Sequence, residues 1–242
     1  PNSGETISSI GNIFERVRFE ISDGGTPVTV NIGGLRLVST QKKAYVLFTF
    51  DDSYKSTVSK ALPILERYGM KGTSFNIKEN IGYSANHLTI SDLQLLERLG
   101  WTNAIHGSAP NDNGWGNLTE EQLVAYIKDS IKYFEDNNIT SGNDLCAYPN
   151  GYFGNDLNNY VYNTAKRFFK LARTTNSSST EPWCEVSQPL ALRTGRTFYL
   201  EASLTPANVI VDIDRLASEG GLGIFVNHDI VDSGATSSSY LT

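Results

Sequence analysis

The sequence predicts an α/β protein: an irregular (β/α) barrel of about seven parallel strands, preceded by a small N-terminal β segment. Three observations predict this fold. From residue 44 onward, apolar runs of strand length alternate with helical patterns, which is typical of a mainly parallel sheet. About seven strand–helix units follow one another, and that number favours a closed or nearly closed barrel over an open sheet. The length of 242 residues allows one such barrel.

The first 43 residues have a different pattern. Alternating apolar and polar residues at 17–22 and 28–32 flank an Asp-Gly-Gly turn, and a shorter run follows at 35–38. The pattern predicts a hairpin of half-buried strands and a third short strand. Three strands alone make a poor core. We therefore expect residues 1–43 to be the end of a preceding β-sandwich, with its upstream domain missing here, or a flap against the barrel domain, 44–242.

Periodicity and end signals place the elements of the barrel. The predicted strands are 45–50, 72–77, 102–105, 145–148, 171–174, 197–201 and 222–227. The predicted helices are 57–68, 89–99, 119–137, 156–169 and 206–220. The first strand is almost continuously apolar, as expected of a strand buried on both faces.

Helix signals support these boundaries. Thr89 is a predicted N-cap, and Thr119 with Gln122 predicts a capping box. Pro206 occupies a first helical position. Pro63 lies inside the first helical pattern, so it must kink that helix or mark its true first turn.

Composition excludes several classes of protein. The net charge of −6 argues against a nucleic-acid binder or an anionic-membrane binder. No apolar run is long enough for a membrane span. The two cysteines, Cys146 and Cys184, form no CxxC motif, which argues against a cysteine zinc site. A disulfide between them and two free thiols both remain open. The chain starts without Met and without a signal peptide, so we expect a processed form or a fragment.

Reactive side chains follow the predicted strands. In chain order they are Asp51 and Asp52, Asn76, His106, Pro149, Arg173, the loop near Arg193, and His228 with Asp229. Because barrel active sites lie at the carboxyl ends of the strands, these groups should converge. Carboxylates, imidazoles and arginines in one pocket indicate a metal-assisted or acid–base site.

Each of these residues also has a structural interpretation. An Asp pair after a strand often only caps the next helix. His106 could be a surface histidine, His228 could support the barrel rim, and Arg173 and Arg193 could form surface salt bridges. Their coincidence at successive strand ends favours the functional interpretation. His87, in a polar loop, is expected to be structural.

The first strand and its continuation resemble a known family. The resemblance lies in the stretches LFTFDD (47–52), ALPIL (61–65), YG (68–69) and KGTSF (71–75). They are similar to the opening of polysaccharide deacetylases of the NodB-homology type, and the likeness covers about residues 44–230. It implies that Asp51 is the general base and that Asp52 is a metal ligand.

The second motif of that family is a pair of histidines four residues apart. The resemblance implies that His106 is a ligand, but Pro110 stands at the second position. Catalytic zinc sites usually have three protein ligands, so Asp112 is the expected replacement. Asn111, Asn113 and a water are alternatives. The implied cofactor is a divalent metal, Zn²⁺ first, with Co²⁺, Ni²⁺ or Mn²⁺ as alternatives.

The later motifs supply the remaining roles. Tyr148-Pro149-Asn150-Gly151 resembles the family's third motif, with Ala147 in place of its arginine. It implies that the Asn150 N–H stabilises the oxyanion. Arg173 resembles an arginine of the branch that lacks the earlier one, and we expect it to hold Asp51 ionised and oriented. His228, after an apolar strand, resembles the family's general acid.

Several aromatic residues lie near the predicted mouth. The expected substrate contacts are Tyr148, Pro149, Trp115 and Trp183. Aromatic rings there could stack on sugars, or they could simply pack loops onto the barrel.

The resemblance implies a metal-dependent hydrolase that removes N- or O-linked acetyl groups from a polysaccharide. A catalytically impaired barrel, acting as a glycan-binding or structural module of a surface or phage-tail protein, is the alternative. A glycosidase using Asp51 and a second carboxylate leaves the histidines unexplained. The expected partner is an acetylated polysaccharide, without nucleic acid or membrane insertion. Its location implies an extracellular, cell-envelope or virion-associated protein.

Overall fold

The computed structural model of the chain describes residues 43–108, 114–154, 159–175, 197–200, 205–219, 221–232 and 240–241. The predicted N-terminal hairpin and its third strand lie outside these residues.

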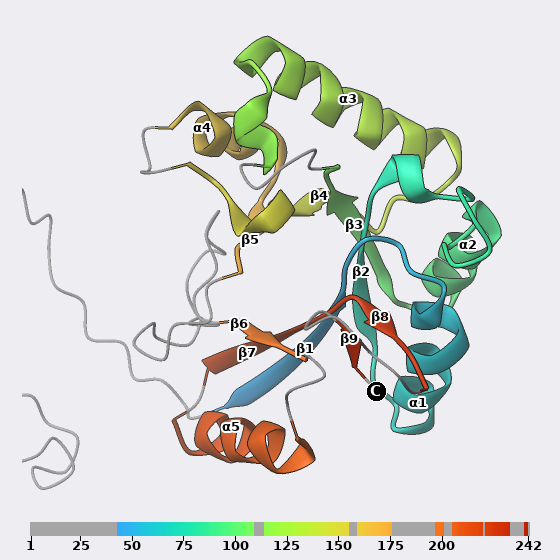
Figure 1. Ribbon diagram of the computed structural model, residues 1–242, viewed down its shortest axis with the longest axis vertical. Coiled ribbons are helices and arrows are strands. Elements are labelled where there is room, and N and C mark those ends of the chain that lie inside the picture. Colours follow the sequence, from blue (N-terminus) through green and yellow to red (C-terminus); the bar gives the residue numbers. More distant parts are fainter. Residues whose placement is uncertain are drawn as a thin grey trace, which may run out of the picture. The chain divides into compact units, whose positions relative to one another are not determined.

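Seven parallel strands form one sheet, and they confirm the predicted fold class (Figure 1). They are β1 (Ala44–Phe50), β2 (Gly72–Asn76), β3 (Thr102–His106), β4 (Gly142–Ala147), β5 (Leu171–Arg173), β6 (Thr197–Tyr199) and β7 (Gly221–Asn227). Their order in the sheet is β5-β4-β3-β2-β1-β7-β6. The sheet curls, so that the strand ends face one another across its concave side (Figure 1). A small parallel pair, β8 (Asp229–Ile230) and β9 (Tyr240–Leu241), follows β7.

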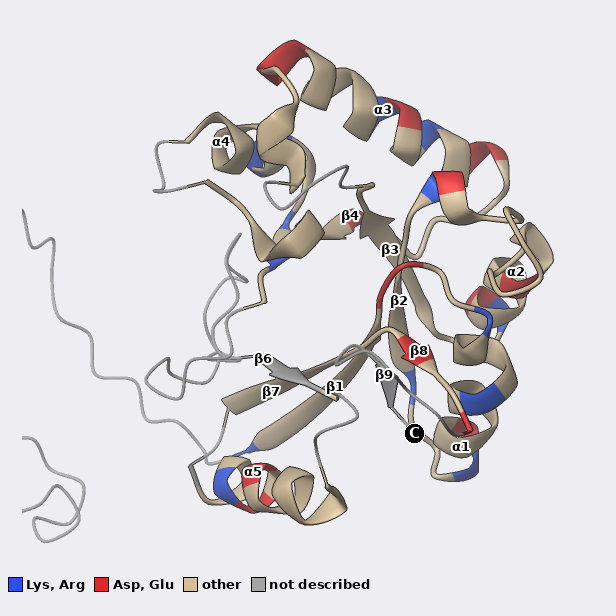
Figure 2. Ribbon diagram, viewed as in Figure 1, with Lys and Arg blue, Asp and Glu red and all other residues tan. Residues whose placement is uncertain are grey.

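Helices connect the strands and cover the convex side of the sheet (Figure 1). They are the π-helical turn η2 (Thr57–Ala61), α1 (Leu62–Arg67), α2 (Ile90–Arg98), α3 (Glu120–Asp136), α4 (Tyr160–Phe168) and α5 (Pro206–Glu219). Short 3₁₀ turns are η3 (Lys78–Asn80), η4 (Gly114–Asn117) and η5 (Pro149–Gly151). Most Lys, Arg, Asp and Glu residues in the described part of the chain belong to these helices and their loops (Figure 2). Among the described residues, no helix combines the length and apolar character that a membrane crossing requires.

The predicted helix signals explain where helices begin. Both capping boxes are present, from Thr89 to Asp92 and from Thr119 to Gln122. Pro63 lies in the first turn of α1, directly after η2. The helix predicted from residue 156 begins later, at Tyr160, because the side chain of Asn159 caps it by accepting the Val161 N–H at 2.9 Å.

Alternation along the strands separates the core from the site. On the convex side, Phe50 packs against Trp101 with ring centroids 5.6 Å apart, within the main core under the helices. On the concave side, Phe75, Ala104 and Ala147 form a small separate cluster. Successive strand residues point to opposite faces. The concave face therefore also carries Asp51, His106, Arg173 and His228.

Cys146 lies on the convex side as a buried free thiol. Burial raises the pKa of this thiol well above its usual value. Cys184 lies outside the described residues.

Candidate active site

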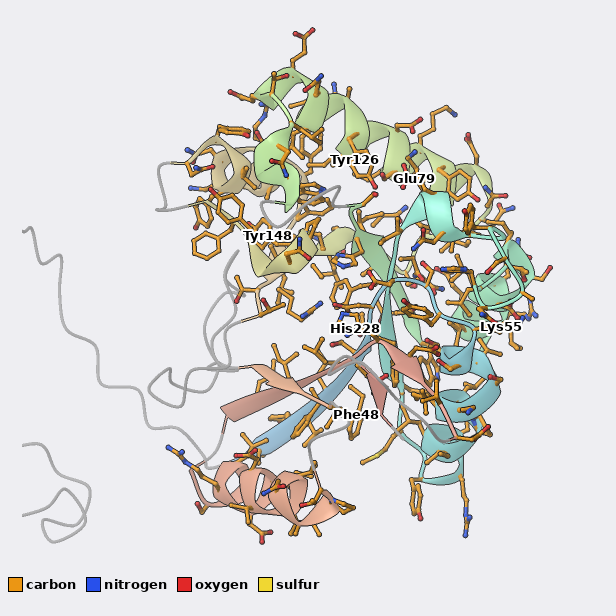
Figure 3. All side chains as sticks on the ribbon, in the orientation of Figure 1. Phe48, Lys55, Glu79, Tyr126, Tyr148 and His228 are labelled. Atoms are coloured by element: carbon orange, nitrogen blue, oxygen red, sulfur yellow. The ribbon has the colours of Figure 1, made fainter. Side chains whose placement is uncertain are left out.

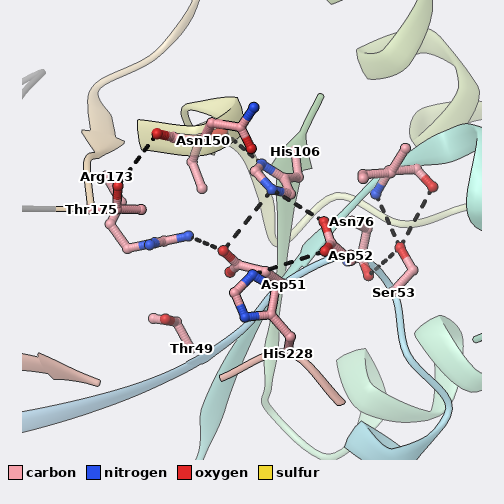
Figure 4. Close-up of polar contacts among 12 residues, drawn as sticks. Thr49, Asp51, Asp52, Ser53, Asn76, His106, Asn150, Arg173, Thr175 and His228 are labelled. Carbon is pink, nitrogen blue, oxygen red and sulfur yellow. Dashed lines mark hydrogen bonds and ion pairs between the residues drawn. The ribbon is translucent and has the colours of Figure 1, made fainter. Parts of the chain in front are cut away.

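Asp51 directly follows β1 and forms a buried ion pair. Its N–H donates to the carbonyl of Asn227 at 2.8 Å, which extends the pairing of β1 with β7 by one bond. Its carboxylate accepts a hydrogen bond from the guanidinium of Arg173, at the end of β5 (Figure 4). The two residues are only 2% and 1% exposed. The Arg173 guanidinium also lies 5.0 Å from the ring centroid of Phe75. The sequence predicts the ion pair but not the aromatic ring against the guanidinium.

Asp52 stands on a sharply turned backbone. Asp52 and Ser53 both have a φ of 66°, in the left-handed region that non-glycine residues rarely adopt. Hydrogen bonds hold this turn. The Asp52 carbonyl accepts from the Asn80 side chain at 3.1 Å, and the Ser53 hydroxyl accepts the Ile77 N–H at 3.0 Å. The turn therefore brings two consecutive carboxylates to one mouth.

The Asp52 carboxylate lies between two imidazoles. Its Oδ1 is 3.4 Å from Nε2 of His106, and its Oδ2 is 3.9 Å from Nε2 of His228. Nε2 of His106 is also 4.0 Å from Oδ2 of Asp51. Figure 4 shows both carboxylates between the two rings. The sequence thus correctly expects these four side chains to converge.

The ring of His106 is oriented by a backbone carbonyl. Its Nδ1 lies 2.9 Å from the carbonyl oxygen of Ala147 on the neighbouring strand β4. A carbonyl only accepts, so Nδ1 carries a proton, and Nε2 is the ring nitrogen that faces Asp52. The sequence predicts an acceptor for this N–H, but no side-chain pattern could identify a main-chain oxygen.

The two groups shift each other's pKa. Burial alone would raise the pKa of Asp52, but the hydrogen bond and charge of His106, with His228 and Arg173, lower it overall. Burial opposes protonation of His106, but Asp52 and Asp51 raise its pKa overall. The Asp52 carboxylate therefore favours the protonated form of His106, and protonated His106 favours the ionised form of Asp52.

The pair Asp52 and His106 fits a divalent cation. Two ligands about 2.0–2.2 Å from one tetrahedral ion lie about 3.4 Å apart. The observed separation of 3.4 Å agrees, and an oxygen and an imidazole nitrogen are both zinc donors. Within the described part of the chain, no group of three or more His, Cys, Asp or Glu residues could hold a metal. Asp112, Asn111 and Asn113 lie outside the described residues, so the third ligand stays a prediction.

Two predicted substrate contacts are buried instead. Trp115 and Tyr148 are each 0% exposed, and their rings meet edge-on with centroids 5.9 Å apart. In this arrangement neither ring presents a face to a sugar, which favours the packing alternative. Pro149 is buried as well. Trp183 and Arg193 lie outside the described residues.

Trp115 instead supports the strand end that carries His106. A Cβ added to Gly107 would overlap Nε1 of Trp115 and lie 2.8 Å from Cγ of Pro149. Only a glycine can follow His106 at this distance from the indole. The loop behind it is also fixed, because the Tyr126 hydroxyl accepts the Ser108 N–H and donates to Glu79, both at 3.0 Å (Figure 3).

Other strand-end residues have structural contacts. The Asn76 amide donates to the Ser74 carbonyl at 2.9 Å, so Asn76 does not join the cluster although it ends β2. Asp229 accepts a hydrogen bond from Ser56 at 2.5 Å and ties the segment after His228 to η2. Alternation along β2 would have identified both Asn76 as outward-facing and Phe75 as inward-facing.

Asn150 has a φ of 54° within η5. Its carbonyl accepts a hydrogen bond from Thr175 at 3.5 Å, which joins η5 to the segment after Arg173 (Figure 4). Its predicted role as an oxyanion donor is not tested by these contacts.

A family model described as polysaccharide deacetylase matches residues 38–168. The chain is 32% identical over 158 residues to "Putative polysaccharide deacetylase YxkH" of Bacillus subtilis (strain 168), covering 64% of this chain and 55% of that protein. It is 34% identical over 82 residues to a bifunctional xylanase/deacetylase of Pseudobutyrivibrio xylanivorans, covering 34% of this chain and 13% of that protein. The chain therefore spans about half the length of the first relative and much less of the second.

Solved structures support the fold. The Streptococcus pyogenes deacetylase PplD matches with a TM-score of 0.53 and 24% identity, covering 69% of each chain. A family 4 carbohydrate esterase of Streptomyces lividans matches with a TM-score of 0.51 and 14% identity, covering 76% of this chain and 79% of that one.

Proposed function

The chain belongs to the polysaccharide deacetylase family, and from that premise we propose that it is a metal-dependent hydrolase of acetylated polysaccharides. One observation carries the proposal. The carboxylate of Asp52 and the imidazole of His106, from two different strand ends, lie 3.4 Å apart with Asp51 and His228 beside them. The group removed is an N- or O-linked acetyl group, and the same site chemistry can hydrolyse either the amide or the ester.

Asp52 and His106 would hold the cation, Zn²⁺ first, with Co²⁺, Ni²⁺ or Mn²⁺ as alternatives. When bound, it supplies Lewis acidity that lowers the pKa of a water and polarises the acetyl carbonyl. Asp112 is proposed as the third ligand.

Asp51 acts as general base and takes the proton of the attacking water. The Arg173 guanidinium holds its carboxylate in one orientation from the far side of the barrel. A fixed base needs no reorganisation when the proton moves. This role is supported by the burial of both residues, which keeps competing water away from the ion pair.

His228 acts as general acid and gives a proton to the leaving nitrogen or oxygen. Its Nε2 lies on the opposite side of Asp52 from His106. The proposed acid and the proposed ligand His106 therefore lie on opposite sides of Asp52. The N–H of Asn150 is proposed to donate to the developing oxyanion.

The proposed location of the protein follows from its proposed substrate. Acetylated polysaccharides lie outside cells, so the protein would act in an extracellular, cell-envelope or virion-associated setting.

The alternative is a catalytically impaired barrel that binds glycan. Its support is that, among the described residues, no group of three or more His, Cys, Asp or Glu side chains is arranged to hold a metal ion.

Metal content and acetate release decide between the two. After incubation with Zn²⁺ and desalting, the wild-type protein should contain about one metal ion per chain and release acetate from acetylated xylan or N-acetylglucosamine oligomers. Asp52→Asn should lose both. Asp136→Asn, whose carboxylate forms an exposed ion pair on α3, should keep both. Metal-free wild-type protein that releases no acetate with any of the four cations, yet binds these glycans, would establish the alternative.

A further inference from the structure

Three rings form a row beside the proposed active site, in the loop between β2 and α2 and the turn after β1. We call Tyr54, His87 and Tyr83 the rim ladder. The rings of Tyr54 and His87 stack with centroids 5.6 Å apart and planes at 19°. Tyr83 meets His87 edge-on, at 5.8 Å and 80°. Both segments follow the carboxyl ends of their strands, so the ladder lies on the mouth side of the barrel.

Backbone bonds join the rim ladder to the proposed metal ligand's own turn. Tyr54 and His87 form an isolated antiparallel bridge. The Leu88 N–H donates to the Ser53 carbonyl, and the Lys55 N–H donates to the Asn86 carbonyl, both at 2.8 Å. The ladder therefore starts two residues after Asp52 and has a fixed place relative to it.

The loop that carries Tyr83 is built to hold one shape. The Gly82 N–H donates to the Leu88 carbonyl at 2.8 Å, and the His87 N–H donates to the Ser84 carbonyl at 3.0 Å. The Ser84 hydroxyl lies 2.8 Å from Nδ1 of His87 and fixes that ring. Yet Tyr83 is 78% exposed. A well-bonded loop thus holds a large ring in water, where it contributes little to the core.

We propose that the rim ladder binds a sugar unit of the polysaccharide chain, next to the unit that carries the acetyl group. This inference rests on the proposed function and extends it by assigning a contact surface to a neighbouring unit of the substrate chain. The C–H faces of a sugar ring are apolar and its edge is polar, which matches an exposed tyrosine ring with its hydroxyl. The surrounding residues Ser84, Ala85 and Asn86 are small or polar and exposed, unlike the apolar core of a protein interface.

A binding experiment tests the ladder without relying on catalysis. The probes are two-unit and six-unit oligomers of N-acetylglucosamine and of acetylated xylose, titrated calorimetrically into Asp52→Asn protein so that no substrate is consumed. In at least one series, the six-unit oligomer should bind more tightly than the two-unit oligomer. Adding Tyr83→Ala should weaken six-unit binding by about fivefold, as expected for one aromatic contact, and change two-unit binding less than twofold.

Two further variants separate stacking from folding. Tyr83→Phe keeps the ring and should bind within twofold of the parent. Tyr68→Ala removes a ring of similar exposure, 68%, at the end of α1 where the chain enters the amino-terminal end of β2, away from the carboxyl ends of the strands, and should have no effect. Equal effects of Tyr83→Ala on both lengths, no effect on the six-unit oligomer, or no six-unit binding in either series would overturn the proposal. Tyr83-dependent binding together with failure of the wild-type protein to release acetate would reject the proposed function but retain the ladder.

Discussion

Arg173 contacts Asp51 although three strands, β2, β3 and β4, lie between their own strands in the sheet. In a flat sheet, four strand spacings would separate β1 from β5 by about 19 Å, beyond the reach of an arginine and an aspartate together. The ion pair therefore forms only because the sheet curls into a barrel wall. It links barrel curvature directly to the orientation of the proposed base.

Replacing Arg173 should affect stability as well as activity. Arg173→Gln leaves the buried Asp51 carboxylate without a counter-charge, and we expect the free energy of unfolding to fall by about 3 kcal/mol or more. Denaturant unfolding measures this. Asp51→Asn in the same protein should restore much of the stability but no acetate release. Arg167→Gln, which breaks an exposed ion pair on α4, should cost less than about 1 kcal/mol. Equal losses for the two arginine variants would contradict the buried-pair interpretation.

Gly107→Ala should disturb the strand end that carries His106. The added methyl group overlaps the Trp115 indole, and such overpacking destabilises by about 1–3 kcal/mol. The midpoint temperature of thermal unfolding and the metal content should both decrease. Adding Trp115→Phe removes the overlapping ring atoms and should recover part of the loss in the double variant. A Gly107→Ala protein with unchanged unfolding and metal content would show that the indole does not buttress this strand end.

Metal binding should be visible as stabilisation of the folded protein. After chelation and removal of the chelator, Zn²⁺ at about 100 times its dissociation constant should add about 2.7 kcal/mol to the free energy of unfolding. His106→Gln should abolish the rise, whereas His87→Gln should keep it, because His87 contacts Ser84 and Tyr54 instead. A rise that survives His106→Gln would place the ion elsewhere.

Asp92 should make part of the stability depend on pH. Burial alone would raise the pKa of Asp92, but hydrogen bonds from Lys55 and Thr89 lower it overall. Because the folded pKa lies below the unfolded value of about 4, the contribution is present above pH 4 and disappears as the pH falls through the folded pKa. The difference in unfolding free energy between wild type and Asp92→Asn should therefore shrink from pH 7 to pH 2. A constant difference would contradict this.

Most strands could be predicted because they are buried apolar runs with clear ends. β1, predicted as 45–50, spans Ala44–Phe50. β4 begins at Gly142 rather than residue 145, because its first three residues, Gly-Asn-Asp, have no apolar signal. Their strand conformation depends on pairing with β3, where a Cβ on Gly142 would lie 2.5 Å from the Asn103 carbonyl oxygen.

The side chains that make up the site could be predicted from the sequence, but the contacts that orient them could not. Strand ends identified Asp51, His106, Arg173 and His228, because the barrel brings those ends together. Chain order alone says nothing about which face a residue occupies, so Asn76 was wrongly expected at the mouth. The carbonyl of Ala147 that orients His106 is a main-chain group on the neighbouring strand. Any residue type there would supply it, so the sequence cannot identify it.

The alternation of inward and outward residues gives these strands little tolerance for changes in length. Inserting or deleting one codon within β3 would shift His106 by one position along the strand. Its imidazole would then point toward the helices on the convex side instead of into the site. Two codons would restore its direction but move it about 7 Å along the barrel. Length variation among homologous chains should therefore be confined to the loops, and comparing strand lengths between homologues can reveal it.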